Sequence, residues 1–264
     1  MKTRVVTALA IGAVAIAAVL WLPSWGLVVL LGLFWLAGAW EWAQFSRELR
    51  VPGAVYSACF LILMLLSEWF LDASGTMLVA AIAIGWWVVA IGLLWCYPRG
   101  LSTLVVLLAG PLTLIPAWLL LSYLHRLGPQ GPALTLSLLA IVWAADVGAY
   151  LTGRRFGSVK LAPRVSPGKT WEGVVGGVLF AVLTAAVAAA VLETNMVAFV
   201  AVALAATLVS VVGDLTVSMF KRNVGLKDSG RLLPGHGGVL DRIDSLAAAV
   251  PFFFFGLHLA GLWV

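Results

Sequence analysis

Long apolar segments separated by short polar ones follow one another along the whole chain. Most last about 20 residues without the apolar–polar alternation of a barrel strand, and about 20 residues of helix cross the hydrocarbon core of a bilayer. We predict nine spans, at 5–22, 25–45, 53–71, 75–97, 101–124, 133–151, 171–192, 196–217 and 246–264. The pattern predicts an all-α, polytopic integral membrane protein.

The first and the fifth apolar segments carry further signals. Lys2 and Arg4 precede the first apolar segment, as they would in a signal peptide, but no small-residue cleavage site follows and the next apolar segment begins at once. We therefore interpret the first segment as a retained span. Pro111 and Pro116 lie in the fifth segment, where we expect them to kink the helix.

Composition supports the membrane assignment. Of the 264 residues, 63% are hydrophobic and 10% are charged, whereas soluble domains average about 25% charged residues. Cys59 and Cys96 lie in apolar segments, so we expect packing and no disulfide framework. The net charge of +5 is concentrated in a few loops. It therefore indicates membrane orientation and anionic ligands, and no nucleic-acid partner.

The basic residues divide unequally between the two sides of a nine-span chain. Every one of the 16 Lys and Arg residues except Arg126 falls on the side of the N-terminus. Basic loops stay in the cytoplasm, so the N-terminus and the two long polar segments, 152–170 and 218–245, are predicted to be cytoplasmic. We divide the chain into N-terminal helices, 1–130, as scaffold, dimer contact or lipid-access region, and a catalytic region, 131–264, that carries both polar segments.

The polar segment 218–245 is the densest in charge and glycine. Its charged and glycine residues include Lys221, Arg222, Lys227, Asp228, Arg231, Gly237, Gly238, Asp241, Arg242 and Asp244. Glycine allows positive φ and close approach of backbone N–H groups to an anion, so we expect a tightly folded, non-helical backbone around a ligand. Cations and backbone donors suit phosphate. The alternative is a solvated cytoplasmic loop.

Four aspartates lie at the cytoplasmic ends of predicted spans. Asp146 and Asp214 each lie within roughly 8 Å of the interface at about 1.5 Å rise per residue. Asp241 and Asp244 are three residues apart and share a helix face. Four carboxylates at one level would repel one another without a cation, and oxygen ligands select Mg²⁺. The alternatives are helix capping by Asp241 and Asp244, and pairing of Asp146 with a nearby arginine. Glu41 and Glu68 are interpreted as packing or interface residues.

A third feature is the sequence SPGKTWEG at 166–173. Ser166, Lys169 and Thr170 stand just before a predicted helix N-terminus, whose free N–H groups attract phosphate. The glycine spacing of a P-loop is absent. An ordinary Ser/Thr cap with a solvated lysine is the alternative.

Together these segments resemble a known family. The pattern is Ser218-x-x-Lys221-Arg222-x4-Lys227-Asp228-x5-Pro234-x-His236-Gly237-Gly238-x2-Asp241-Arg242-x-Asp244. It is similar to the signature of the phosphatidate cytidylyltransferases, also called CDP-diacylglycerol synthases. The Asp146-x-x-Ala149-Tyr150-x-x-Gly153 run, the Gly213-Asp214-Leu215 run and SPGKTWEG resemble that family too. The similarity covers residues from about 140 to 250.

The resemblance implies a reaction and a place for it. CTP and phosphatidic acid would give CDP-diacylglycerol and pyrophosphate at the cytoplasmic face of the bacterial inner membrane. It also implies Mg²⁺, a second cation such as K⁺, membrane lipids around the site and a homodimer.

Roles for individual residues follow from the resemblance and the chemistry. Asp214 and Asp241 would hold Mg²⁺, with Asp244 and Asp146 completing the shell. The expected catalytic residues are Asp214, Asp241, Asp244, Lys221 and Lys227. The expected substrate-binding residues are Ser166, Lys169, Thr170, Arg222, Asp228, His236, Gly237, Gly238 and Arg242. His236 is equally a candidate for a structural turn.

Two other functions fit parts of the pattern. An ion-coupled secondary transporter also has acidic residues within spans, although these would lie near the midplane instead of at one face. A CTP-dependent polyprenol or phytol kinase resembles the family in its last spans, and it would release CDP instead of pyrophosphate.

Overall fold

The computed structural model describes residues 2–46, 51–230, 232 and 237–263, with the backbone alone for 2–9 and 11. Most of this described chain is helical. The helices are α1 (Lys2–Trp21), α2 (Ser24–Ala43), α3 (Gly53–Phe70), α4 (Ala73–Cys96), α5 (Thr103–His125), α6 (Gly131–Phe156), α7 (Trp171–Val191), α8 (Met196–Asn223) and α9 (Leu240–Leu259). A 3₁₀ turn, η1 (Gly128–Gln130), precedes α6, and two strands, β1 (Lys160–Ala162) and β2 (Ser166–Thr170), precede α7.

The predicted fold class is confirmed: the protein is an all-α, multi-pass membrane protein. Within the described residues, eight helices, α2 to α9, are long and apolar enough to cross a bilayer. For the first predicted span, only the shorter apolar part Gly12–Trp21 of α1 enters that count. The total of nine spans therefore stays a prediction. Pro111 and Pro116 both lie within the continuous helix α5.

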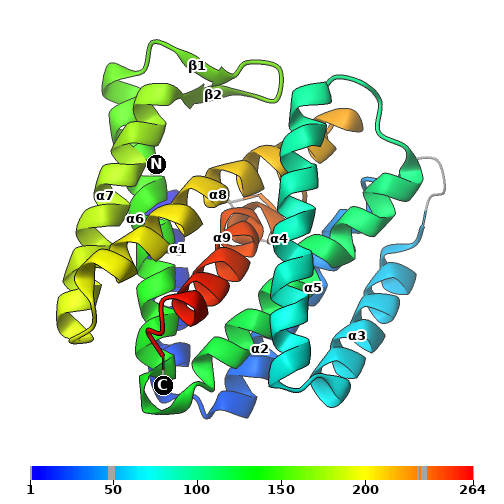
Figure 1. Cartoon of the computed structure of the whole chain (residues 1–264). Helices are drawn as coiled ribbons and strands as arrows, with labels where there is room; N and C mark the ends of the chain where they lie inside the picture. The colour runs from blue at the N-terminus through cyan, green and yellow to red at the C-terminus, as the bar shows by residue number, and fades with distance from the viewer. Residues whose placement is uncertain (1, 47–50, 231, 233–236, 264) are drawn as a thin grey trace.

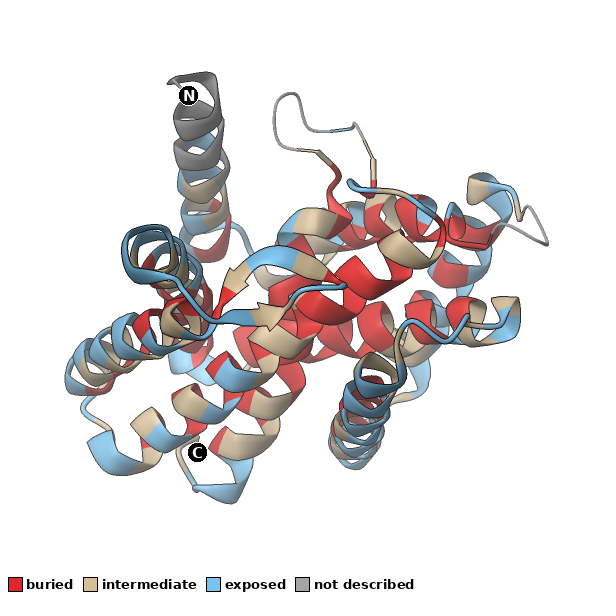
Figure 2. Ribbon diagram, turned by 90° about the horizontal axis from the view of Figure 1, so that it is seen from above, coloured by how far each residue is buried: buried red, intermediate tan, exposed pale blue. Residues whose placement is uncertain are grey.

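The helices surround a core centred on α9. Helix α9 packs against α8 on one side and against α2, α4 and α5 on the other. Phe253 and Phe254 of α9 are fully buried, and Figure 2 shows the buried residues concentrated on the helices in the middle of the bundle. The outward faces of α3, α4 and α7 are largely apolar and exposed, as expected of helices that contact lipid.

Glycines allow the C-terminal helices to cross closely. A Cβ on Gly148 of α6 would lie 2.7 Å from the backbone oxygen of Gly176 in α7. A Cβ on Gly213 of α8 would lie 2.5 Å from the backbone oxygen of Asp244 in α9. Small residues let membrane helices approach until their backbones touch. The second contact brings the C-terminal part of α8 and the N-terminal part of α9 side by side.

Two segments predicted as loops contain regular structure. Helix α6 continues to Phe156, and β1 and β2 then form an antiparallel hairpin at the same end of the bundle as the C-terminus of α8 (Figure 1). Helix α8 continues to Asn223, and α9 begins at Leu240.

The expectation of a non-helical backbone in 218–245 was therefore wrong at its start, where α8 continues to Asn223, whereas Asp241 and Asp244 lie on a helix as expected. Lys221 and Arg222 occupy the last turn of α8, where cations interact favourably with the helix dipole. Helix α8 has 28 residues, so at 1.5 Å per residue it is about 42 Å long and exceeds a hydrocarbon core of about 30 Å. Its charged end can therefore extend past the hydrocarbon.

Candidate active site

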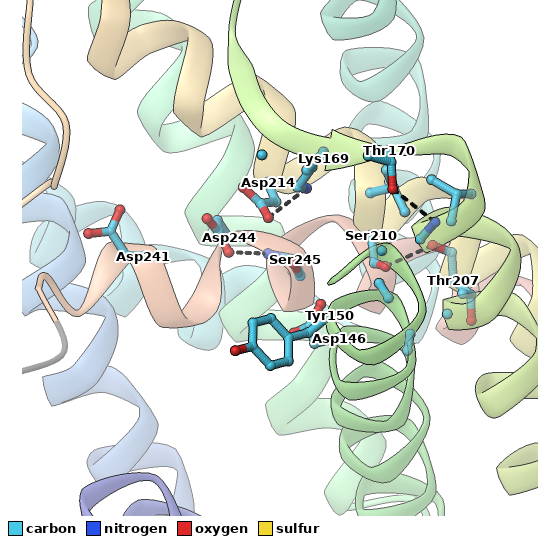
Figure 3. Close-up of a pocket in the computed structure, with 18 of the residues that line it drawn as sticks. Asp146, Tyr150, Lys169, Thr170, Thr207, Ser210, Asp214, Asp241, Asp244 and Ser245 are labelled. Carbon is cyan, nitrogen blue, oxygen red and sulfur yellow. Dashed lines mark hydrogen bonds and ion pairs between the residues drawn. The ribbon is translucent and has the colours of Figure 1, made fainter. Parts of the chain in front are cut away.

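A cavity of about 590 Å³ opens between β2 and the ends of α6, α7, α8 and α9. This size is ordinary for a site that binds a small molecule. Nine of the predicted site residues line it: Asp146, Lys169, Thr170, Asp214, Lys221, Asp228, Asp241, Arg242 and Asp244. Residues far apart along the chain thus meet at one place, as the sequence analysis expected (Figure 3).

Strand β2 delivers Lys169 to the cavity. Its Nζ lies 2.6 Å from the Asp214 carboxylate of α8, and about a quarter of the lysine side chain is exposed. Thr170, the next residue, caps α7 by accepting a hydrogen bond from the backbone N–H of Gly173 at 3.2 Å. The Ser/Thr-cap alternative is therefore correct for Thr170. The alternative of a solvated lysine is wrong, because Lys169 is paired with an aspartate.

The hairpin that carries Lys169 is fastened to α7. Glu172, in the first turn of α7, accepts a hydrogen bond from the Ser158 hydroxyl and another from the backbone N–H of Val159 at 3.1 Å. A carboxylate in the first turn of a helix also interacts favourably with the helix dipole. Thr170 and Glu172 together hold both ends of the hairpin, so Lys169 is presented from a supported backbone.

Asp146, Asp214 and Asp244 form the acidic part of the cavity. Asp244 is 6% exposed and accepts a hydrogen bond from the backbone N–H of Ser245 at 2.7 Å. Asp214 is close enough to Asp146 and Asp244 to repel both carboxylates. Lys169 offsets part of this repulsion. Three helices therefore contribute one carboxylate each to a single region.

Asp241 lines the same cavity but binds other partners. Lys221 Nζ lies 2.6 Å from Oδ1 of Asp241, and Oδ2 accepts hydrogen bonds from the backbone N–H groups of Ser229 at 3.0 Å and Gly238 at 3.2 Å. In Figure 3 Asp241 lies apart from Asp214 and Asp244. The expected meeting of all four carboxylates is thus not seen. Residues three apart on a helix differ by about 60° in direction and about 4.5 Å in height, which is enough to give them different partners.

The donor chemistry of the acidic region suits a hard cation. Within the described residues no group of three or more Asp, Glu, His or Cys side chains is close enough to hold a metal ion. Mg²⁺, however, is commonly held by one or two carboxylates together with waters and substrate phosphates. Asp214 and Asp244 are oxygen donors beside a cavity with room for phosphates, and they fit that kind of site.

The other predicted site residues that the structure describes lie outside the cavity lining. Ser166 begins β2, Lys227 is exposed, and Gly237 has a positive φ of 80°. Arg222 donates to the backbone oxygens of Val165 and Leu226, so it ties the hairpin to the end of α8. Gly238 contributes its N–H to Asp241. His236 lies outside the described residues.

The sequence analysis missed several residues of the site. Tyr150, Thr207, Ser210 and Ser245 also line the cavity. Thr207 and Ser210 could have been found, because they precede Asp214 by seven and four residues and therefore lie on its face of α8. Glu41 was treated as a packing residue, yet it is buried and hydrogen-bonded to the segment that leads into α9.

Fold and site together define a multi-pass membrane protein with a cavity of paired acidic and basic side chains at the ends of its spans. Comparison with known proteins identifies the family of this chain. The model of the cytidylyltransferase family matches residues 2–260. The chain belongs to this family.

Several relatives carry the name phosphatidate cytidylyltransferase. The protein of Haemophilus influenzae is 39% identical, over 96% of this chain and 97% of the relative. That of Pseudomonas aeruginosa is 40% identical, over 99% and 98%. That of Brucella suis is 36% identical, over 97% and 93%. The resemblance found in residues 140 to 250 therefore extends over nearly the whole chain.

Proposed function

We propose that this protein is a nucleotidyltransferase that transfers CMP from CTP to phosphatidate, giving CDP-diacylglycerol and pyrophosphate. Full-length similarity to enzymes named phosphatidate cytidylyltransferase carries the proposal. The cavity supports it, because cations and carboxylates of α6, β2, α8 and α9 surround a volume suited to a nucleotide and a lipid headgroup.

The reaction requires alignment and charge neutralisation more than a protein nucleophile. The phosphatidate phosphate is an anion at neutral pH and can attack the α-phosphorus of CTP, while the bond to the departing pyrophosphate breaks. Lys169 and Arg242 line the cavity and would offset the charge of the phosphates. Thr170 and Glu172 hold Lys169 in place, so little reorganisation is needed when substrates bind.

We propose Mg²⁺ as the cofactor, held by Asp214 and Asp244 with Asp146 nearby. The bound ion would neutralise charge on the phosphate oxygens. Asp241, predicted as a further ligand, is engaged by Lys221 and two backbone N–H groups in this structure. A second cation such as K⁺ rests on the family resemblance.

The proposed setting is the cytoplasmic face of a bacterial inner membrane. The basic residues favour a cytoplasmic N-terminus and a cavity that faces the cytosol. CTP would then enter from water and phosphatidate from the surrounding bilayer. We also propose a homodimer, as the resemblance implies, which mass measurement in lipid nanodiscs would test.

Identification of the products tests the function directly. Purified protein is incubated with CTP labelled in its cytidine, phosphatidate and Mg²⁺, and the organic phase is extracted. We expect a labelled CDP-lipid and one pyrophosphate released per lipid formed. Release of CDP with a phosphorylated lipid would indicate a lipid kinase instead. Uptake of a solute into proteoliposomes without any lipid product would indicate a transporter.

A further inference from the structure

Glu41, near the C-terminus of α2, is a carboxylate in an unusual setting. Glu41 is only 1% exposed, so its carboxylate is out of contact with solvent. It accepts hydrogen bonds from the Ser229 hydroxyl at 2.8 Å and from the backbone N–H groups of Val239 at 3.0 Å and Leu240 at 2.9 Å. A buried carboxylate is tolerated only when its oxygens are satisfied in this way.

Two of these donors belong to the N-terminus of α9. The first N–H groups of a helix have no partner within the helix, and a side chain at the N-cap position usually satisfies one of them. Val239 holds the N-cap position of α9 and has no side-chain acceptor to offer. Glu41, almost 200 residues earlier in the chain, supplies the missing cap. Its negative charge also suits the positive end of the helix dipole.

Glycines make room for this carboxylate. A Cβ on Gly230 would lie 2.2 Å from Oε1 of Glu41, and a Cβ on Gly238 would lie 2.3 Å from Oε2. At these two positions the tight, glycine-rich backbone therefore encloses a carboxylate of the protein itself. One turn earlier in α2, Gly38 allows close contact with Ile243 of α9. Helix α2 thus abuts α9 at the turn that carries the site aspartates.

Asp241 also bonds the segment that leads into α9, from the side opposite Glu41. Ser229 donates its backbone N–H to Asp241 and its hydroxyl to Glu41. Gly238 donates to Asp241, while its neighbour Val239 donates to Glu41. The two carboxylates therefore fix the beginning of α9 between them. Because Asp244 lies one turn further along α9, the same contacts set its position opposite Gly213 and Asp214.

We infer that Glu41 is a positioning residue for the transfer reaction: it caps α9 from α2 and so sets the placement of Asp244 beside Asp214. Glu41 does not line the cavity, so it acts through Ser229 and the start of α9. The kinetic part of this inference rests on the proposed function, whereas the structural part does not.

The test compares Glu41→Gln and Glu41→Ala with Glu68→Gln. Glu68 pairs with Arg126 and lies away from the cavity, so its substitution controls for loss of a carboxylate from a neighbouring helix. The measurements are kcat and KM for CTP per folded protein, together with hydrogen exchange of the peptide that contains residues 237–245.

We expect a defect confined to turnover and to the start of α9. Misplacement of reacting groups by about 1 Å can reduce rates by about 100-fold, so kcat of Glu41→Ala should fall roughly 10- to 100-fold with an unchanged KM for CTP. Glu41→Gln keeps the size and one acceptor oxygen, so it should lose less activity. In both variants the backbone amides of Val239 and Leu240 should exchange hydrogen faster, which raises the exchange rate of the peptide that contains them. Glu68→Gln should match the wild type in both measurements.

Two results would overturn the inference. One is wild-type kcat in Glu41→Gln and in whatever folded Glu41→Ala can be recovered. The other is unchanged exchange at the start of α9 in a variant with reduced kcat. If hydrogen exchange in the Glu41 variants is faster as expected but the wild-type protein forms no CDP-lipid, the proposed function is refuted and the capping role remains.

Discussion

Each carboxylate of the cavity has its own set of partners, and these partners predict different consequences of substitution. Asp214 pairs with Lys169, which is partly exposed. Asp241 pairs with Lys221, and both of those side chains are nearly buried. Asp244 is buried and bonded to its neighbour's backbone. Substitutions in the first pair should therefore affect mainly catalysis, and those in the second should also affect folding.

Asp214→Asn should abolish most of the activity while leaving the protein folded. It removes the charge proposed to hold the cation, and loss of one electrostatic group at a reacting centre costs about 10²- to 10³-fold in kcat. CDP-lipid synthesis by purified protein measures the effect. Glu193→Gln, in the exposed turn between α7 and α8, is the matched control and should be fully active. Near-normal turnover in Asp214→Asn would remove Asp214 from the site.

Lys221→Met should destabilise the protein, because it leaves Asp241 charged and nearly buried without its cation. Removing one partner of a buried pair costs about 3–5 kcal/mol. Thermal unfolding in detergent should show a clearly lower midpoint for Lys221→Met and little change for Lys169→Met, whose partner Asp214 is about 31% exposed. The double variant Lys221→Met/Asp241→Asn should regain part of the stability without activity, because the asparagine oxygen still accepts from the backbone N–H groups of Ser229 and Gly238. Equal midpoints for the two single variants would contradict this distinction.

At the scale of elements, close helix crossings place the site. Helices α6 and α7 meet through Gly148 and Gly176, and α8 and α9 meet through Gly213. The hairpin of β1 and β2 is fastened to the start of α7, which brings Lys169 over the cavity. The length of the apolar segments predicted the helices, but it carries no information about which glycines face a neighbour.

Gly148→Ala should destabilise the α6–α7 pair, because its new methyl group would lie 2.7 Å from a backbone oxygen that cannot turn aside. Overpacking of this kind costs about 1–3 kcal/mol. The control is Gly85→Ala in α4, where a Cβ meets nothing within 4 Å. We expect a lower unfolding midpoint in detergent for Gly148→Ala and an unchanged or slightly higher one for Gly85→Ala. The opposite order would argue against tight α6–α7 packing.

At the scale of the whole molecule, α9 joins the two halves of the chain. It carries Asp241 and Asp244 and packs against α2, α4 and α5 as well as α8. Glu41 of α2 reaches the start of α9. The N-terminal helices, proposed as a scaffold, therefore contact the helix that carries the site.

Cysteine labelling should establish the orientation of the whole molecule. In a background without Cys59 and Cys96, Arg164→Cys in the hairpin should react with an impermeant thiol reagent only from the cytoplasmic side. Glu193→Cys in the α7–α8 turn should react only from the opposite side, because an odd number of spans separates the two positions. Intact cells and inverted membrane vesicles provide the two sides. Labelling of both cysteines from one side would refute the proposed topology.

The sequence by itself determined the fold class, the approximate span limits and most of the charged residues that line the cavity. Runs of apolar side chains must be buried in lipid as helices, and polar residues at the ends of such runs are costly unless they serve a purpose. Asp146, Asp214 and Asp244 stood out for that reason. Thr207 and Ser210 share the helical spacing of Asp214 but are uncharged, so they did not stand out.

Only the tertiary structure decided which polar groups pair. Asp241 turns toward Lys221 and Lys169 toward Asp214, because hydrogen-bond geometry depends on the rotation and height of each helix, and packing sets both. Glu41 shows this most clearly. Nothing near residue 41 in the sequence indicates that its carboxylate caps a helix beginning at residue 240, since that contact exists only once α2 and α9 lie side by side.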